Sequence, residues 1–124
     1  RFCQVTGVQT CALPIYDAAL RGIGIERAAA EQVELLAEVA REGGIAGVVA
    51  SPQEAGLLRR VLGPAAYIVT PGVRPAGADK GDQSRVATPQ EAFDAGASHI
   101  VIGRPVTCAE NPARAFDTIV SEIS

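Results

Sequence analysis

Apolar positions in this chain switch between helical spacing and the continuous runs typical of buried strands. Four apolar residues at i, i+3, i+4 and i+7 predict a helix that ends at Gly43-Gly44; they are Val33, Leu36, Ala37 and Ala40. Two later sets of apolar residues at the same helical spacing predict a helix that ends at Gly63-Pro64 and a last helix that begins at Asn111-Pro112.

Three short apolar runs alternate with these helices, at 47–50, 67–70 and 100–102. They lack polar alternation, which is typical of strands covered on both faces. Strands that alternate with helices form parallel sheets through right-handed crossovers. We therefore expect one α/β domain, with parallel strands near 47–51, 66–70 and 99–103.

Two similar tetrapeptides predict where helices begin. Ser51-Pro52-Gln53-Glu54 and Thr88-Pro89-Gln90-Glu91 each offer a capping hydroxyl, a proline in the first turn and a glutamate that completes a capping box. Gly96 ends the helix that Thr88 begins.

The connection between the second strand and this helix is unusually long. It spans the seventeen residues 71–87, whereas such connections usually have about two to six. A long polar loop at the carboxyl end of a strand is usually a lid or a ligand clamp. Arg74 and Gln83 lie near its two ends, where they could bind a ligand or be solvated, and their spacing alone leaves both open.

The third strand runs directly into Gly103-Arg104. Glycine allows an anion to approach the backbone N–H, and arginine adds a forked cationic donor. The carboxyl ends of parallel strands share one edge of the sheet, so Gly72, Arg74, Gln83 and Arg104 should lie on the same side. This arrangement favours a phosphate pocket, although an arginine in an ordinary surface turn is the alternative.

Composition excludes several classes of function. A net charge of −3 offers no basic surface for nucleic acid, and the absence of tryptophan argues against base stacking. No apolar run is long enough to span a membrane. Cys108 is the only cysteine after residue 15, which leaves no disulfide framework or C-x-x-C pair and favours a reducing cytoplasm. We assign Cys108 no function.

Longer motifs resemble the C-terminal signature of the orotidine 5′-phosphate decarboxylase family. They are Val-Thr-Pro-Gly-Val-Arg-Pro-Ala-Gly at 69–77, Gly-Asp-Gln-Ser-Arg at 81–85, Thr-Pro at 88–89 and Val-Ile-Gly-Arg-Pro-Val-Thr at 101–107. Residues 47–54 are similar to the preceding strand and turn of that family, with Ala50 where cysteine is frequent. The resemblance runs from about Tyr16 to the C-terminus.

The resemblance implies the C-terminal part of a TIM (β/α)8 barrel from a cytoplasmic homodimeric lyase. That family converts orotidine 5′-phosphate to UMP in de novo pyrimidine synthesis, without metal or organic cofactor. By position, the Gly103 backbone and Arg104 would bind the phosphate, and Gln83 would reach across phosphate and pyrimidine. Arg74 would also bind substrate. Ser51 would contact the pyrimidine as well as cap its helix.

The resemblance also implies catalytic residues that this sequence lacks. The family depends on an aspartate and a lysine from early strands and on an Asp-x-Lys-x-x-Asp motif, whose lysine protonates the carbanion. Lys80 is the only lysine, and its setting in Asp79-Lys80-Gly81-Asp82 has the wrong spacing. His99 stands at the start of its strand, away from the expected site, which favours a structural role. We expect no catalytic residue here and no activity from this chain alone.

Residues 1–15 fit none of these patterns. The segment Val5–Ile15 resembles the conceptual translation of a sequencing-library adapter, and it is no secretory signal. We therefore set 1–15 aside as non-native and treat 16–124 as the C-terminal half-barrel of a longer decarboxylase.

Two other interpretations stay open. One is a fragment of another phosphate-binding TIM-barrel lyase, such as a sugar-phosphate decarboxylase or aldolase relative, against which Asp82-Gln83 in the long loop argues. The other is a stand-alone phosphate-binding module, for which half a barrel leaves two sheet edges open.

Overall fold

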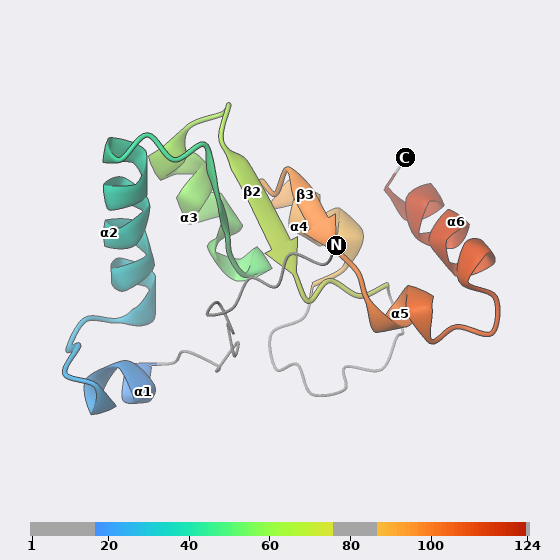
Figure 1. Cartoon of the computed structure of the whole chain (residues 1–124), viewed down its shortest axis with the longest axis horizontal. Helices are drawn as coiled ribbons and strands as arrows, with labels where there is room; N and C mark the ends of the chain where they lie inside the picture. The colour runs from blue at the N-terminus through green and yellow to red at the C-terminus, as the bar shows by residue number, and fades with distance from the viewer. Residues whose placement is uncertain (1–16, 76–86, 124) are drawn as a thin grey trace, which may run out of the picture.

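The computed structural model describes residues 17–75 and 87–123. Its centre is a parallel sheet in the order β1-β2-β3, formed by β1 (Gly47–Val49), β2 (Tyr67–Pro71) and β3 (His99–Val101). Figure 1 labels β2 and β3 in the middle of the molecule. Val48 pairs with Ile68 in the first ladder, and Thr70 pairs with Ile100 in the second. The predicted parallel α/β arrangement is confirmed, since each strand lies at its predicted place.

Six helices accompany the sheet in the described part of the chain: α1 (Asp17–Gly22), α2 (Ala29–Glu42), α3 (Pro52–Leu62), α4 (Pro89–Asp94), α5 (Arg104–Thr107) and α6 (Pro112–Glu122). The sequence pattern predicted α2, α3, α4 and α6. It missed α1 and α5 because elements of six and four residues are too short to repeat an apolar stripe. No helix among the described residues has the length and apolar character needed to cross a membrane.

Side-chain caps fix the starts of three helices. Thr88 and Glu91 form the predicted capping box, in which Thr88 Oγ1 accepts from the Glu91 N–H at 3.2 Å and Glu91 Oε2 accepts from the Thr88 N–H at 2.8 Å. Asn111 Oδ1 caps α6 by accepting from the Arg114 N–H at 3.0 Å. Ser51 Oγ instead accepts from the Gln53 N–H at 3.4 Å, one residue earlier than a capping box requires.

The helices cover one face of the sheet. Ile68 packs in a core cluster with Ala37 of α2 and with Ala55 and Leu58 of α3. A second cluster around α4 joins Val73, Ala92 and Ala97. Alternate strand residues point to opposite faces, and Ile68 and Thr70 on the helix side are fully buried.

The opposite face of the sheet is exposed among the described residues, which corrects the expectation that both faces are covered. Val49 is 72% exposed, Tyr67 56% and Val101 51%. A run of valines and isoleucines indicates burial on two faces, but the described helices pack against only one of them. In a (β/α)8 barrel the second face is the barrel interior, which needs strands on the far side.

Candidate functional site

A hollow of about 210 Å³ lies at the carboxyl ends of β2 and β3. One wall is the turn that follows β2, residues 71–74, and the other is formed by Val101 and residues 103–105. Of the predicted site residues, the structure thus brings Arg74, Gly103 and Arg104 together, and Gly72 lies beside them. Their predicted position at the carboxyl side of the sheet is confirmed.

The turn after β2 is fixed by backbone geometry. Gly72 has a φ of +78°, a conformation that favours glycine. Val73 next to it is 1% exposed and forms a parallel bridge with Ala87, and the Arg74 N–H donates to the Ala87 carbonyl at 3.0 Å. The two ends of the long connection are therefore held together by backbone hydrogen bonding beyond the carboxyl end of β2.

Arg74 is buried to an unusual degree for an arginine. Its side chain is 8% exposed, and its Nε finds no hydrogen-bond partner among the residues that the structure describes. A buried guanidinium is costly unless an anion or an acceptor compensates it. Because Arg74 lines the hollow, an anionic ligand there would supply that compensation.

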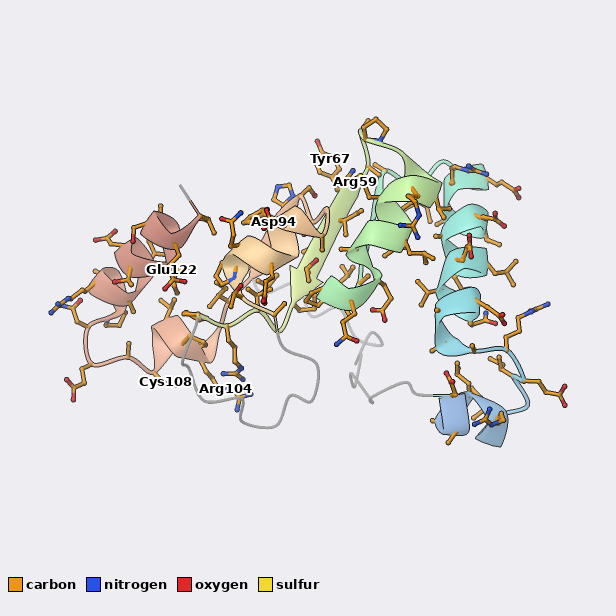
Figure 2. The ribbon with its side chains drawn as sticks, turned by 180° about the vertical axis from the view of Figure 1, so that it is seen from behind. Arg59, Tyr67, Asp94, Arg104, Cys108 and Glu122 are labelled. Atoms are coloured by element: carbon orange, nitrogen blue, oxygen red, sulfur yellow. The ribbon has the colours of Figure 1, made fainter. Side chains whose placement is uncertain are left out.

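Gly103-Arg104 forms the turn into α5. The Gly103 carbonyl accepts from the Val106 and Thr107 N–H groups at 2.9 and 3.1 Å, which fixes the direction of the turn. A Cβ on Gly103 would meet no heavy atom within 4 Å, so there is open space beside this backbone. The Arg104 side chain is exposed and extends from α5 away from α4 (Figure 2).

The charge of the hollow suits an anion. Two arginines line it, and its other lining residues in the described part of the chain are glycine, proline and valine, none of them a carboxylate. Guanidinium forks bind phosphate oxygens in pairs of parallel hydrogen bonds. Across the described ranges, no group of three or more His, Cys, Asp or Glu side chains is placed to hold a metal ion.

One predicted site residue that the structure describes, Ser51, does not line this hollow. Ser51 follows β1 at the same edge of the sheet, but the hollow is built from the ends of β2 and β3. Its hydroxyl caps α3, as predicted, and that bond uses an acceptor lone pair, so the O–H proton can still be donated. Gln83 lies outside the described residues.

His99 and Cys108 are not among the described residues that line the hollow. His99 begins β3, at the opposite end of that strand from Val101, and its Nδ1 is 3.0 Å from Ser98 Oγ. Its ring packs 5.7 Å from the ring of Tyr67. These contacts agree with the structural role expected for His99. Cys108 is an exposed free thiol directly after α5, labelled in Figure 2.

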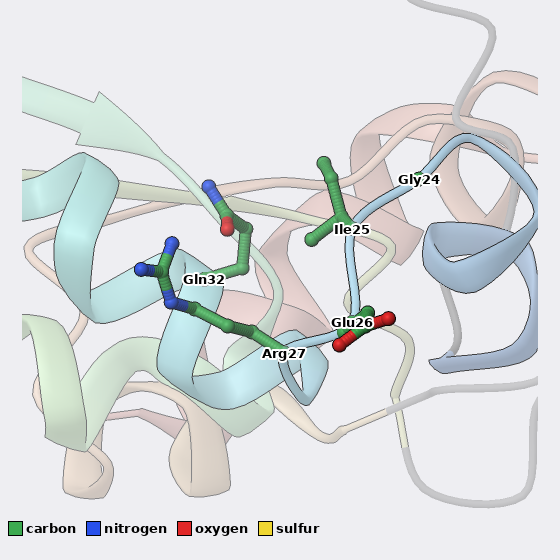
Figure 3. Close-up of a pocket in the computed structure, with 5 residues that line it drawn as sticks. All are labelled: Gly24, Ile25, Glu26, Arg27 and Gln32. Carbon is green, nitrogen blue, oxygen red and sulfur yellow. The ribbon is translucent and has the colours of Figure 1, made fainter.

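A second hollow, of about 570 Å³, lies on the connection between α1 and α2. Its lining residues are Gly24, Ile25, Glu26, Arg27 and Gln32. In Figure 3 Glu26 points away from Arg27, so the charged groups do not converge on one position. The residues that line this second hollow are distant in sequence from those at the carboxyl ends of β2 and β3, and their side chains do not form a recognisable ligand site.

Sequence reasoning missed Thr70, which lies directly before the β2 turn. Thr70 is fully buried on the helix side of the sheet, and its Oγ1 has no hydrogen-bond partner among the described residues. Thr70 belongs to the motif at 69–77, but threonine is an ordinary strand residue, so nothing in the sequence indicated a separate role for it.

Comparisons with known proteins agree with this geometry. The sequence profile of the orotidine 5′-phosphate decarboxylase / HUMPS family matches residues 16–119. The chain is 56% identical over 101 residues to an orotidine 5′-phosphate decarboxylase from Moorella thermoacetica and 52% identical over 104 residues to one from Pelobacter propionicus. These matches cover 82% and 84% of this chain but 40% and 43% of the relatives.

Solved structures show the same relationship. The crystal structure of an orotidine 5′-phosphate decarboxylase from Lactobacillus acidophilus superposes with a TM-score of 0.74 at 37% identity, over 90% of this chain and 46% of the other. The corresponding enzyme from Pyrococcus horikoshii gives a TM-score of 0.58 at 32% identity. The chain therefore spans less than half the length of these relatives, and its three parallel strands are part of a TIM barrel. The chain belongs to the orotidine 5′-phosphate decarboxylase / HUMPS family.

Proposed function

We propose that this chain carries the substrate-phosphate site of an orotidine 5′-phosphate decarboxylase. One observation supports this above all: two glycine-arginine turns, after adjacent parallel strands, line one hollow, and none of its described lining residues is a carboxylate. Phosphate sites in TIM barrels lie at this same edge, in the loops that follow the last strands.

The residues that line the hollow would have different roles in substrate binding. Arg104 and the backbone N–H of Gly103 would hold the phosphate, with the exposed Arg104 side chain as the forked donor. Arg74 is buried beside them and would contribute a second fixed positive charge to the substrate. Ser51 would donate to the pyrimidine from the neighbouring strand end, and Gln83 is proposed from the family resemblance alone.

The proposed role of these residues is binding rather than proton transfer. Decarboxylation breaks the bond to the departing carbon dioxide and leaves an electron pair on the pyrimidine ring, which must accept a proton. The family resemblance assigns that proton to a lysine in Asp-x-Lys-x-x-Asp, and these 124 residues contain no such motif. We propose that this chain alone binds but does not decarboxylate. For the whole protein, the same resemblance supports a cytoplasmic homodimer.

The relatives favour this reaction over other phosphate chemistry. The family's name covers more than one activity, and a sugar-phosphate lyase would also need a phosphate hollow. Relatives from Moorella thermoacetica, Pelobacter propionicus, Aliivibrio fischeri and Shewanella sediminis, at 49–56% identity, are however named orotidine 5′-phosphate decarboxylases.

A hybrid enzyme tests the proposal. Residues 17–123 would replace the matched segment of the Moorella thermoacetica relative, and release of carbon dioxide from orotidine 5′-phosphate would be measured. The hybrid should turn over the substrate, and the chain alone should not. A folded hybrid that accepts a sugar phosphate but not orotidine 5′-phosphate would contradict the proposed substrate.

A further inference from the structure

One side chain of α3 contacts the connections that lead into both β2 and β3. The Arg59 Nε and Nη2 atoms donate to the carbonyl oxygen of Gly96, shortly before β3, at 3.1 and 2.8 Å. The Arg59 Nη1 atom donates to three carbonyl oxygens of the connection before β2, at 2.8 to 3.0 Å; they belong to Gly63, Pro64 and Ala66. We call this set of hydrogen bonds the Arg59 clamp.

The two strands that the Arg59 clamp joins at their amino ends carry the two walls of the hollow at their carboxyl ends. β2 runs into residues 71–74, and β3 runs into residues 103–105. Figure 2 shows Arg59 beside Tyr67, at the end of the sheet away from Arg104. The clamp is therefore separated from the arginines of the proposed phosphate site by the length of the strands, and it touches no residue of the hollow.

Between these two ends, β2 and β3 form a packed unit. The strands pair along residues 69–71 and 99–101. The stem of Arg59 also packs closely on the β3 side, because a Cβ added to Gly96 would lie 3.1 Å from the Arg59 Cβ. Close-packed interiors transmit small displacements and have few voids that could absorb them. A shift of β2 against β3 at the clamp should therefore reach the turns at the other end.

We infer that Arg59 is a positioning residue for the phosphate site: it fixes β2 against β3 and thereby sets the distance between the turns that carry Arg74 and Arg104. The inference rests on the proposed function and adds to it a residue that touches no substrate. Two guanidinium groups can share one phosphate only where they converge on it. A displacement of about 1 Å by a distant substitution can cost about a hundredfold in activity.

A guanidinium suits this role better than an ammonium group does. Its planar fork carries separate N–H donors, so one side chain reaches the Gly96 oxygen and the oxygens before β2 at the same time. Lysine keeps the positive charge and most of the aliphatic stem, but its donors sit on a single nitrogen. Arg59→Lys therefore breaks the clamp on at least one side without a change in net charge.

Inhibition of the hybrid enzyme by UMP tests the positioning role. UMP carries the phosphate of the substrate, and its inhibition constant reports binding to folded enzyme rather than the amount of folded enzyme. Arg59→Lys should raise this constant about tenfold. Leu20→Ala is the matched control, because it removes a buried side chain of α1 that lies outside both core clusters. It should lower the melting temperature but change the inhibition constant by less than about twofold.

A double-mutant cycle separates positioning from stability. If Arg59 acts through the turn that carries Arg104, its replacement should matter little once the Arg104 side chain is absent. The effect of Arg59→Lys on the inhibition constant should therefore fall from about tenfold to less than about twofold in the Arg104→Ala background. A residue that serves stability alone would show no such coupling to Arg104.

Gly96→Ala disturbs the clamp from the β3 side while it keeps the guanidinium, so it provides a second test if Arg59→Lys does not fold. It should raise the inhibition constant in the same direction. A constant that changes no more than in Leu20→Ala, or independent effects in the cycle, would overturn the inference. If Arg104→Ala alone leaves the constant unchanged, the proposed function fails as well. If Arg104→Ala raises it and the clamp variants do not, only the positioning role of Arg59 fails.

Discussion

Arg59 and Gly96 are joined by a forked hydrogen bond across 37 positions of sequence. The Arg59 Nε and Nη2 atoms both donate to the Gly96 carbonyl oxygen, at 3.1 and 2.8 Å. Arg59 Nη1 also donates to the carbonyls of Gly63, Pro64 and Ala66, at 3.0, 3.0 and 2.8 Å. One side chain of α3 therefore ties together the connections that lead into β2 and β3.

Replacement of Arg59 should destabilise the fold. Arg59→Met keeps much of the aliphatic stem but leaves several partly buried carbonyls without their donor, which should cost about 2–4 kcal/mol of unfolding free energy. Urea denaturation of the 124-residue chain measures this loss. Arg60→Met removes the same charge from the exposed neighbour and should change stability by less than about 0.5 kcal/mol. Equal effects from both variants would contradict the structural role of Arg59.

Gly47 should tolerate no side chain. A Cβ at this position would overlap the backbone oxygen and Cβ of Tyr67, the residue opposite it in β2. Gly47→Ala must therefore push β1 away from β2 and should cost about 1–3 kcal/mol. Thermal unfolding checks the shift, with Gly22→Ala as the control because a Cβ there meets nothing within 4 Å.

The Ser98 hydroxyl makes hydrogen bonds to the backbone of β2 just before β3 begins. It accepts from the Ile68 N–H at 2.8 Å and donates to the Ile68 carbonyl at 3.1 Å. Ile68 is fully buried, so Ser98→Ala would leave that N–H without a partner and should cost about 1–3 kcal/mol. Ser121→Ala removes an exposed hydroxyl on α6 and should have little effect in the same denaturation assay. If both variants unfold at the same denaturant concentration as the parent, the bond to Ile68 contributes nothing.

The capping box of α4 should make stability sensitive to acid. The backbone N–H and hydroxyl of Thr88 lower the pKa of Glu91 below its ordinary value of 4.5. Because the pKa of Glu91 is lower in the folded chain than in the unfolded chain, ionised Glu91 stabilises the fold. This stabilisation is present above pH 4.5 and is lost as pH falls through the folded pKa. Glu91→Gln should thus lower the melting temperature at pH 7, and the gap from the parent should narrow towards pH 3. Glu38→Gln, on the exposed side of α2, controls for loss of one negative charge.

The sequence predicted which segments form helices and strands better than it predicted which residues pack against them. The stripe through Ala37 and the cap at Thr88 are local features, so the 3.6-residue period and the turn chemistry located α2 and α4. The apolar run of β1 could not reveal that Val49 has no cover among the described residues, because burial of that face depends on elements distant in sequence. Likewise, nothing in the local pattern predicts the contacts of Arg59, which join turns brought together only by the folded sheet.

In the candidate site, too, local features were predictable from the sequence and long-range contacts were not. Gly103-Arg104 was predictable because a glycine directly after an apolar strand has a local backbone consequence. The burial of Arg74 was not, since it depends on residues that the fold brings together, as the bridge between Val73 and Ala87 does across the long connection. Ser51 lies at the expected edge, directly after β1, yet the described lining of the hollow comes from the ends of β2 and β3, and sequence spacing could not show which neighbouring turns share a hollow.

The decisive substitutions for the proposed phosphate site are Arg104→Ala and His99→Ala in the hybrid enzyme. A charged group contributes about 1.5–3 kcal/mol per hydrogen bond to a phosphate. Loss of a forked contact should therefore lower kcat/KM for orotidine 5′-phosphate roughly a hundredfold or more. His99 begins β3 at the end away from the hollow, so His99→Ala should lower the melting temperature while kcat/KM stays near that of the parent. Steady-state kinetics on both variants measures the difference, and near-normal kcat/KM for Arg104→Ala would show that the Gly103-Arg104 turn serves the fold rather than the phosphate.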